Sequence, residues 1–255
     1  MLPRRTLTPL PAAVCSPIEW TVDASLASSV LSLHGVVALR RPLSPDVCER
    51  WVKGTYGARA SWTADFGDDQ FSLGRAFYTH LEQDRTAAYF RDAATSDARV
   101  EQHAPGLQSA MHALAVTVTG GQVRARRGWC GPGIHVFPAH GHVATHGGVV
   151  HFDTEGLTEH HLSRGARALS VVCMLQPPSV GGGLRVWDVL YEGDDHPEDD
   201  DLETESVMAV YEVGDVVVFD SYRLHQIQPF GGEQDRISVT VHLAEVDDGH
   251  WESWF

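Results

Sequence analysis

The chain has 255 residues, a formal net charge of −15 and one lysine, Lys53, among its 19 basic residues. Nucleic-acid surfaces need clustered positive charge, so we expect no nucleic-acid partner. No apolar run is long enough to span a membrane and the N-terminus lacks the apolar core of a signal peptide, so we expect no membrane association and a cytoplasmic protein.

The first 120 residues predict a strand and several helices. A short strand is expected at GVVAL, residues 35–39. A helix should start at Ser44-Pro45-Asp46, because Ser is a favoured N-cap and Pro a favoured first residue. Residues 61–80 are expected to form a loop, with a strand at its end in GRAFYTH, residues 74–80. Two further helices are expected at about 82–96 and 100–118.

From residue 121 onward, eight short apolar or alternating segments are separated by Gly, Pro and Asp. Such spacing is typical of an antiparallel sandwich or barrel. We therefore expect an α+β fold that is mainly β: a cupin-like jelly roll with N-terminal helices packed on one face. The chain should form a single domain over residues 1–255, in which residues 1–120 support the jelly-roll core of residues 121–255. The acidic segment 192–205 is expected to be a solvated loop between two strands.

Three side chains form a candidate metal site. His151 and Asp153 are two residues apart in GVVHFD, so on a strand they would point to the same side. His225 ends the run VVVFDSYRLH, after a turn that contains Gly214. Two imidazoles and one carboxylate leave positions open on iron for a cosubstrate and O2. An HxD motif alone is weak in a chain with 15 histidines, but the combination with His225 and the later Arg236 is much more specific.

Arg236 lies in the alternating segment DRISVTVHL and should share one face of a strand with Ser238 and Thr240. A buried arginine is costly unless it meets an anion, and a dicarboxylic cosubstrate would supply one. Ser238 would add a hydroxyl contact. Trp187, on a predicted strand, either lines the cosubstrate pocket or packs in the core.

The motifs HFD, GD before the distal histidine, and RIS resemble the Fe(II)/2-oxoglutarate-dependent oxygenase superfamily over residues 130–245. The resemblance implies a double-stranded β-helix, with His151, Asp153 and His225 as ligands of Fe(II). It implies Arg236, with Ser238, as the anchor of 2-oxoglutarate. The implied activity is that of a dioxygenase, which uses O2 to hydroxylate a C–H bond while 2-oxoglutarate is converted to succinate and CO2.

Comparison within the superfamily narrows the expected activity. The related halogenases replace the ligand carboxylate by a small residue so that chloride can bind, whereas this chain has Asp153. AlkB-type demethylases carry a second arginine where this chain has His242, and collagen-type prolyl hydroxylases anchor the cosubstrate by a lysine that is missing here. The resemblance therefore favours a hydroxylase of an unactivated C–H bond in a small metabolite of secondary metabolism, such as a free or derivatised amino acid.

Two alternatives remain open at this point. The same iron site and cosubstrate serve desaturation, cyclisation and epimerisation, because the fate of the substrate depends on the geometry of the pocket. A non-catalytic, cupin-like protein that binds a metal or a small ligand would also use such a fold. Arg236 counts against this second alternative, because a plain cupin has no need of an arginine at that position.

Overall fold

The computed structural model describes residues 15–255 of the chain. The helices are α1 (Ala27–His34), α2 (Pro45–Gly57), α3 (Phe77–Glu82), α4 (Thr86–His103), α5 (Leu107–Thr119), α6 (His142–His146) and α7 (Glu159–Arg164). The N-terminal strands are β1 (Cys15–Pro17), β2 (Trp20–Thr21), β3 (Val36–Leu39), β4 (Thr63–Ala64) and β5 (Phe71–Leu73). The later strands are β6 (Gln122–Ala125), β7 (Gly133–Phe137), β8 (Ala168–Gln176), β9 (Val180–Gly181), β10 (Leu184–Leu190), β11 (Ser206–Ala209), β12 (Val216–Asp220), β13 (Arg223–Ile227), β14 (Phe230–Gly231), β15 (Arg236–Asp247) and β16 (His250–Trp254).

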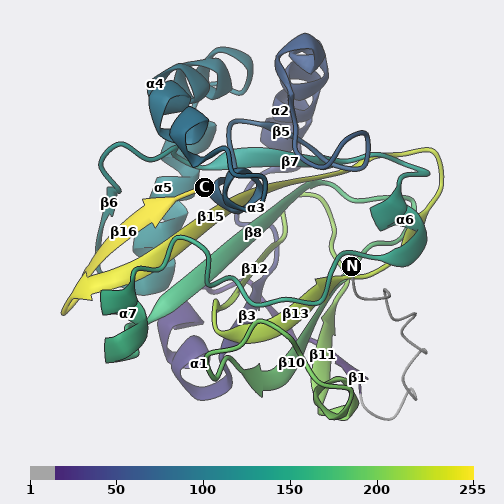
Figure 1. Ribbon diagram of the computed structural model, residues 1–255. Coiled ribbons are helices and arrows are strands. Elements are labelled where there is room, and N and C mark those ends of the chain that lie inside the picture. Colours follow the sequence, from purple (N-terminus) through teal and green to yellow (C-terminus); the bar gives the residue numbers. More distant parts are fainter. Residues whose placement is uncertain (1–14) are drawn as a thin grey trace.

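The strands of the described residues form two main sheets (Figure 1). The larger sheet has ten strands and follows the order β2-β3-β12-β8-β15-β7-β5-β4; in addition, β16 pairs with β15, and β6 pairs with β16. The smaller sheet has four strands in the order β1-β11-β10-β13. At the centre of the larger sheet, Val171 of β8 lies between Val218 of β12 and Val241 of β15. These β-branched residues suit a strand that is buried on both faces.

Two apolar layers cover the two faces of the large sheet. On one face, α1, α2, α4 and α5 contribute to the main core together with alternate residues of β8, β12 and β15, including Ile237, Val239 and Val241. On the other face, Val217 and Phe219 of β12 pack against β10 and β11 of the smaller sheet. The predicted mainly β jelly roll with helices packed on one face is thus confirmed. Arg236, Ser238 and Thr240 alternate with the helix-facing residues, so they point toward the smaller sheet.

The helices expected from local sequence signals are present. Helix α2 begins at Pro45 after the predicted N-cap Ser44. Helices α4 and α5 begin four and seven residues later than the expected ranges 82–96 and 100–118, so the expected break at residues 97–99 lies inside α4. Helix α5 ends at Gly120, whose positive φ of 65° closes the last turn without a side-chain clash.

The expected strand over residues 74–80 is wrong, because the second half of that segment begins α3 at Phe77. The backbone N–H of Phe77 donates to the carbonyl of Phe255, and the hydroxyl of Thr79 donates to the carbonyl of Ala76. The helix is therefore favoured by a partner 178 residues away in the chain and by a local side-chain bond, neither of which alternation reveals.

The expected strand GVVHFD also differs in the structure. Its only ladder pairing is an isolated bridge in which His151 and His225 exchange backbone hydrogen bonds, His151 N to His225 O at 3.2 Å and His225 N to His151 O at 3.0 Å. The segment follows β13 but pairs at intervals, with Gly148 N bonded to Ile227 O and Asp153 N bonded to Ser221 O. The acidic segment 192–205 does lie between β10 and β11 and is mostly exposed, as expected. Over residues 15–255, no helix has the length and apolar character needed to cross a membrane.

Candidate active site

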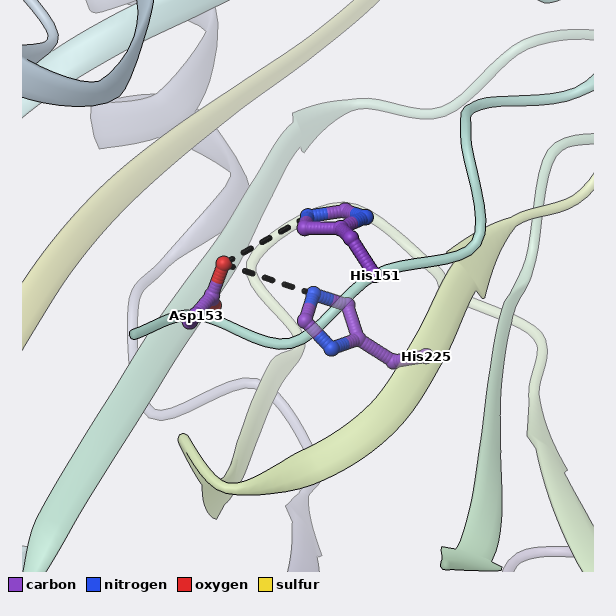
Figure 2. A group of neighbouring side chains, drawn as sticks. All are labelled: His151, Asp153 and His225. Carbon is purple, nitrogen blue, oxygen red and sulfur yellow. Dashed lines mark ion pairs between the residues drawn. The ribbon is translucent and has the colours of Figure 1, made fainter. Parts of the chain in front are cut away.

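His151, Asp153 and His225 come together as a compact group of potential metal ligands (Figure 2). One ligand atom from each residue lies within 4.8 Å of the other two. Asp153 Oδ1 is 3.4 Å from His151 Nε2 and 3.5 Å from His225 Nε2. The bridge between the His151 segment and β13 places the two imidazole rings side by side, with centroids 4.2 Å apart. Residues 72 positions apart in sequence thereby share one site.

Backbone carbonyls orient both imidazole rings. His151 Nδ1 lies 2.8 Å from the carbonyl oxygen of Val149, and His225 Nδ1 lies 3.0 Å from that of Arg223. An Nδ1–H that donates to a carbonyl leaves Nε2 with its lone pair free. Ring orientation of this kind is the usual support for a histidine that binds a metal through Nε2.

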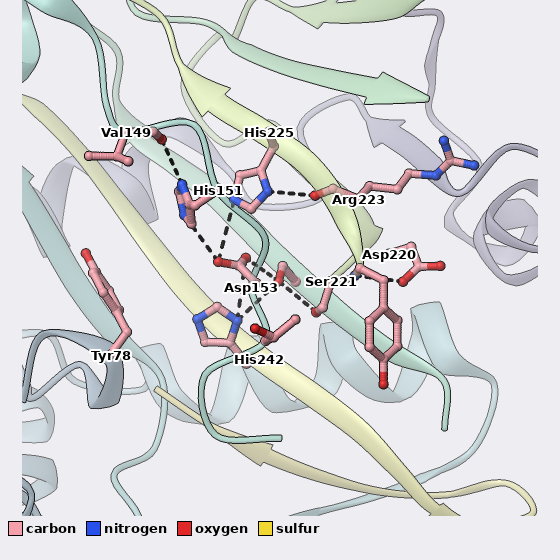
Figure 3. Close-up of polar contacts among 12 residues, drawn as sticks. Tyr78, Val149, His151, Asp153, Asp220, Ser221, Arg223, His225 and His242 are labelled. Carbon is pink, nitrogen blue, oxygen red and sulfur yellow. Dashed lines mark hydrogen bonds and ion pairs between the residues drawn. The ribbon is translucent and has the colours of Figure 1, made fainter. Parts of the chain in front are cut away.

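The second carboxylate oxygen of Asp153 is held from the other side (Figure 3). Ser170 Oγ donates to Asp153 Oδ2 at 2.5 Å, and the same hydroxyl contacts Ser221 Oγ at 3.0 Å and His242 Nδ1 at 3.1 Å. Burial would raise the pKa of Asp153, but the charges of His225 and His242 and a hydrogen bond from His151 hold that pKa well below its ordinary value. Asp153 is therefore a fixed, ionised carboxylate with Oδ1 facing both imidazoles.

These donors fit non-haem iron. Two imidazole nitrogens and one carboxylate oxygen on one side of an ion leave its remaining positions open, which is the donor set and arrangement of iron oxygenases. Among the described residues, no second group of three such side chains meets. His146 is exposed on α6 and stacks on His142, whereas His135 is buried in β7, where burial lowers its pKa to about 3 and keeps it neutral.

Arg236 lies on β15 with only 1% of its surface exposed, and no acidic side chain of residues 15–255 pairs with it. Its Nε donates to the carbonyl of Gly182 at 3.2 Å, and its Nη1 donates to Ser238 Oγ at 3.1 Å. Burial lowers the pKa of Arg236 to about 10, so the guanidinium is still charged at neutral pH. A buried cation with unused donors fits an anionic ligand.

Tyr211 lies beside Arg236 and was not assigned to the site from the sequence. Its hydroxyl is buried without a hydrogen-bond partner, and its ring centroid lies 5.9 Å from the Arg236 guanidinium carbon. Burial, the largest cause, raises the pKa of Tyr211, so the hydroxyl retains its proton and can donate it. The sequence did contain a signal for Tyr211. In SVMAVYEV, Tyr211 stands two residues after Ala209, the spacing of residues on one face of a strand, and Ala209 is buried.

Trp187 is buried among Val150, Phe152, Leu202 and Leu224. Its indole N–H donates to the carbonyl of Leu202 at 3.2 Å. These contacts are those of a core residue, which was one of the two alternatives for Trp187, and a contact with 2-oxoglutarate stays a prediction. The same cluster shows that Phe152, between the two ligands of the HxD motif, anchors its segment from the side away from the metal site.

A small hollow lies directly beside Asp153. Its walls are Phe77 and Tyr78 of α3, Glu155, His242 of β15, and the C-terminal residues Trp254 and Phe255. Figure 3 shows Tyr78 across from Asp153 and His242. A molecule in the hollow would therefore contact the metal site. The aromatic residues of α3 and of the C-terminal segment were not assigned to the site from the sequence, because only the tertiary fold brings them there.

Comparisons with known proteins identify a family and a fold. Residues 32–251 match the family model described as carrier-protein-independent halogenase WelO5. None of the curated proteins matches the chain. The fold resembles the crystal structure of SnoN, a non-heme α-ketoglutarate-dependent epimerase from nogalamycin biosynthesis, with a TM-score of 0.53 and 14% identity over 86% of this chain and 81% of that one.

Two further crystal structures show the same fold. The carbocyclase SnoK, also α-ketoglutarate-dependent and from nogalamycin biosynthesis, gives a TM-score of 0.54 and 16% identity over 87% of this chain and 83% of that one. A Pseudomonas putida prolyl-4-hydroxylase gives a TM-score of 0.50 and 16% identity over 88% of this chain and 98% of that one. The match to the family model covers most of the chain and extends from β3 to β16. The chain therefore belongs to the WelO5 family of Fe(II)/2-oxoglutarate-dependent oxygenases, and the expected cofactors, Fe(II) and 2-oxoglutarate with O2, are confirmed.

Proposed function

We propose that this protein hydroxylates an unactivated C–H bond of a small organic molecule, with iron held by His151, Asp153 and His225. The observation that carries the proposal is the Asp153 carboxylate, whose Oδ1 lies 3.4 and 3.5 Å from the Nε2 atoms of the two histidines. A carboxylate in that place completes a three-residue ligand set. It also occupies the position that a halide would need.

Hydroxylation is favoured over the halogenation for which the matched family is named. Halide binding needs a free position on the metal. In this chain, the Asp153 carboxylate would occupy that position. Ser170 and the neighbouring His242 hold this carboxylate in place, so it is not free to swing away. The proposed reaction therefore ends with transfer of oxygen to the substrate.

Arg236, Ser238 and Tyr211 are proposed to bind the distal carboxylate of 2-oxoglutarate. Among residues 15–255, the guanidinium has no acidic partner and the buried Tyr211 hydroxyl has no hydrogen-bond partner. A dicarboxylate would satisfy both groups through charge-assisted hydrogen bonds. When bound with 2-oxoglutarate and O2, iron supplies the oxidising power that couples decarboxylation to succinate and CO2 with insertion of oxygen into a C–H bond.

The chain's own residues then have three tasks. The carbonyls of Val149 and Arg223 keep the histidine rings oriented, and Ser170 keeps Asp153 oriented. The Arg236 pocket fixes the cosubstrate. The aromatic walls of the hollow exclude water beside Asp153 and receive the substrate.

A small-molecule substrate is supported by the structural neighbours. A crystal structure of SnoN, which matches this chain with a TM-score of 0.54, holds Fe3+, α-ketoglutarate and nogalamycin RO. Four aromatic side chains line the hollow beside Asp153, and these surfaces would contact the apolar part of such a molecule.

The product of turnover tests this proposal. Purified protein is incubated with Fe(II), 2-oxoglutarate and O2 in bromide or chloride buffer, and a panel of small amines, amino acids and neutral metabolites is screened for succinate formation. The product of any accepted substrate should gain one oxygen atom and carry no halogen isotope pattern. A halogenated product, or loss of two hydrogens without oxygen, would contradict hydroxylation.

A further inference from the structure

The side-chain amide of Gln70, directly before β5, contacts two side chains from different elements. Gln70 Nε2 donates to the hydroxyl oxygen of Tyr78 in α3, and it lies 3.3 Å from His135 Nδ1 in β7. Gln70 and His135 are both buried. An amide nitrogen can only donate a hydrogen bond, so the Tyr78 oxygen and His135 Nδ1 both act as acceptors toward Gln70.

This contact fixes where the protons of the two acceptors lie. A neutral imidazole carries one hydrogen, so a His135 ring that accepts at Nδ1 carries it on Nε2. Burial, the largest cause, lowers the pKa of His135 to about 3 and keeps the ring neutral. Burial likewise raises the pKa of Tyr78 well above its ordinary value, so its hydroxyl keeps its proton. Both side chains are therefore donors, and neither donated hydrogen has an acceptor among residues 15–255.

His135 faces the space between the two sheets. Its neighbours Ile134 and Val136 belong to the core under the helices, so the side chain of His135 points to the opposite face of β7. His135 is paired directly with Ser238 of β15, whose hydroxyl accepts a hydrogen bond from Arg236. Directly paired residues of antiparallel strands share a face. The face that carries the proposed 2-oxoglutarate pocket thus also carries His135.

Two observations place this donor pair between Arg236 and the proposed metal ligands. The charge of Arg236 lowers the pKa of His135 and the charge of Asp153 raises it, so the imidazole lies within reach of both charges. Tyr78 lies across from Asp153 and lines the same hollow (Figure 3). A 2-oxoglutarate molecule that reaches from Arg236 to the metal ligands therefore passes beside His135 and Tyr78.

We propose that the Nε2–H of His135 and the hydroxyl of Tyr78 donate hydrogen bonds to the carboxylate beside the keto group of 2-oxoglutarate. Gln70 is the positioning residue that directs both donors to this carboxylate. Arg236 holds the distal carboxylate, so the two ends of the cosubstrate have separate partners. Two neutral donors suit the end near Fe(II), because they bind a carboxylate without adding a positive charge beside the metal. This inference rests on the proposed function and deepens it by assigning the second end of the cosubstrate.

Two 2-oxo acids separate the two ends of the cosubstrate without turnover. 2-Oxopentanoate has the chain length and the keto-acid end of 2-oxoglutarate but lacks the distal carboxylate. Anaerobic protein loaded with Fe(II) is titrated with each acid, and the Kd is read from the visible charge-transfer band. Tyr78→Phe and His135→Phe should each weaken binding of both acids by about tenfold, because each removes one hydrogen bond to a carboxylate.

Two further variants serve as controls in the same titrations. Arg236→Gln should weaken binding of 2-oxoglutarate but leave that of 2-oxopentanoate unchanged. His146→Phe makes the same replacement as His135→Phe at an exposed position of α6 and should leave both Kd values unchanged. If His135→Phe fails to fold, Tyr78→Phe, which removes a single oxygen atom, still tests the donor pair.

The role of Gln70 is read from the position of the His135 proton. In protein loaded with diamagnetic Zn(II), the 15N NMR signals of His135 are those that disappear in His135→Phe. They should report a hydrogen on Nε2 in the wild type. Gln70→Glu offers a carboxylate that only accepts, so the hydrogen should move to Nδ1 and both 2-oxo acids should bind about tenfold more weakly or worse. A merely structural role for Gln70 would not move this proton.

Three results would overturn the assignment of this donor pair. They are unchanged affinity for 2-oxopentanoate in folded Tyr78→Phe or His135→Phe, a wild-type protein that does not bind 2-oxopentanoate, and a His135 hydrogen on Nδ1 in the wild type. A wild-type band with 2-oxoglutarate separates this failure from failure of the proposed function. If that band is present, only the donor pair is rejected. If it is absent, the iron and 2-oxoglutarate site itself is rejected.

Discussion

At the scale of single residues, the proposed site depends on polar side chains that have few partners within the protein. Arg236 is the clearest case, because its charge is buried and, among residues 15–255, its hydrogen-bond partners are the carbonyl of Gly182 and the hydroxyl of Ser238. Truncating a buried donor that holds an ionised ligand generally costs several kcal/mol of binding energy.

Substitution of Arg236 should therefore act on cosubstrate binding. Arg236→Gln is expected to raise the KM for 2-oxoglutarate by about 30-fold or more, which corresponds to about 2 kcal/mol. Arg236→Lys should give an intermediate value, because it keeps the charge but loses the planar fork. The KM is measured from succinate formation, and affinity for iron is measured separately. If both variants bound 2-oxoglutarate like the wild type, Arg236 would have no part in the cosubstrate pocket.

Asp65 shows how a buried carboxyl outside the proposed metal site affects stability. Burial, the largest cause, raises its pKa to about 7, although Thr79 and Ser72 donate hydrogen bonds to its Oδ1. Its Oδ2 is buried without a partner. A carboxyl with a raised pKa binds more protons in the folded than in the unfolded state, so stability falls as the pH rises from the unfolded pKa near 3.8 to about 7.

Asp65→Asn should remove this loss. We expect the free energy of unfolding of the variant, relative to that of the wild type, to increase by about 2 kcal/mol between pH 5 and pH 8. Urea unfolding at the two pH values measures the change. A difference between variant and wild type that stays constant with pH would show that Asp65 is ionised in the folded protein throughout this range.

At the scale of elements, the C-terminal segment builds one wall of the hollow. The carbonyl oxygen of Phe255 accepts hydrogen bonds from the Phe77 N–H and the Tyr89 hydroxyl, and its N–H donates to the carbonyl of Cys130. Its ring lies against β7 at Gly133, where a Cβ would be 2.1 Å from the ring carbon Cε1. The absence of a side chain at Gly133 is thus what lets the C-terminal segment close over the strand.

Gly133→Ala should displace Phe255 and destabilise the protein by about 1–3 kcal/mol, the usual cost of overpacking a buried site. Gly57→Ala is the control, because a Cβ at Gly57 meets nothing within 4 Å and lies in α2, where alanine is favoured over glycine. That control should leave stability unchanged or raise it slightly. Thermal unfolding compares the two variants, and equal stability would mean that Phe255 is free to move away.

Several elements could be predicted from local sequence because their signals are local. The start of α2 follows from Ser44 and Pro45, and β15 follows from its alternating pattern. Helix α3 was mistaken for a strand because the backbone bond between Phe77 and Phe255, distant in sequence, contributes to its conformation. The segment with His151 was expected to be a regular strand, but it makes only an isolated bridge.

At the scale of the whole molecule, the site joins parts of the chain that are far apart in sequence. The three proposed metal ligands could be identified from the sequence, because residue type and spacing point to them, and the structure brings them together. Ser170 and Tyr211 were not assigned, because only the tertiary fold brings them beside Asp153 and Arg236. The sequence contained one indication of Ser170, because it is a polar residue within the mainly apolar strand β8.

Because the ligands come from the loop after α6 and from β13, metal binding should stabilise the folded state. Protein freed of metal by a chelator is expected to unfold at a lower temperature than protein with added Fe(II) under anaerobic conditions. At a metal concentration of about 100 times Kd the gain is about 2.7 kcal/mol. His225→Ala should lose this dependence, as measured by calorimetry. An equal shift in the wild type and this variant would place the bound metal elsewhere.

The most direct test of the central claim is the visible absorption of the anaerobic protein titrated first with Fe(II) and then with 2-oxoglutarate. We expect a weak charge-transfer band that appears only after both Fe(II) and 2-oxoglutarate are added. The band should be absent in His225→Ala and should require much more 2-oxoglutarate in Arg236→Gln. A wild-type protein without the band, or a His225→Ala variant that keeps it unchanged, would contradict an iron and 2-oxoglutarate site at these residues.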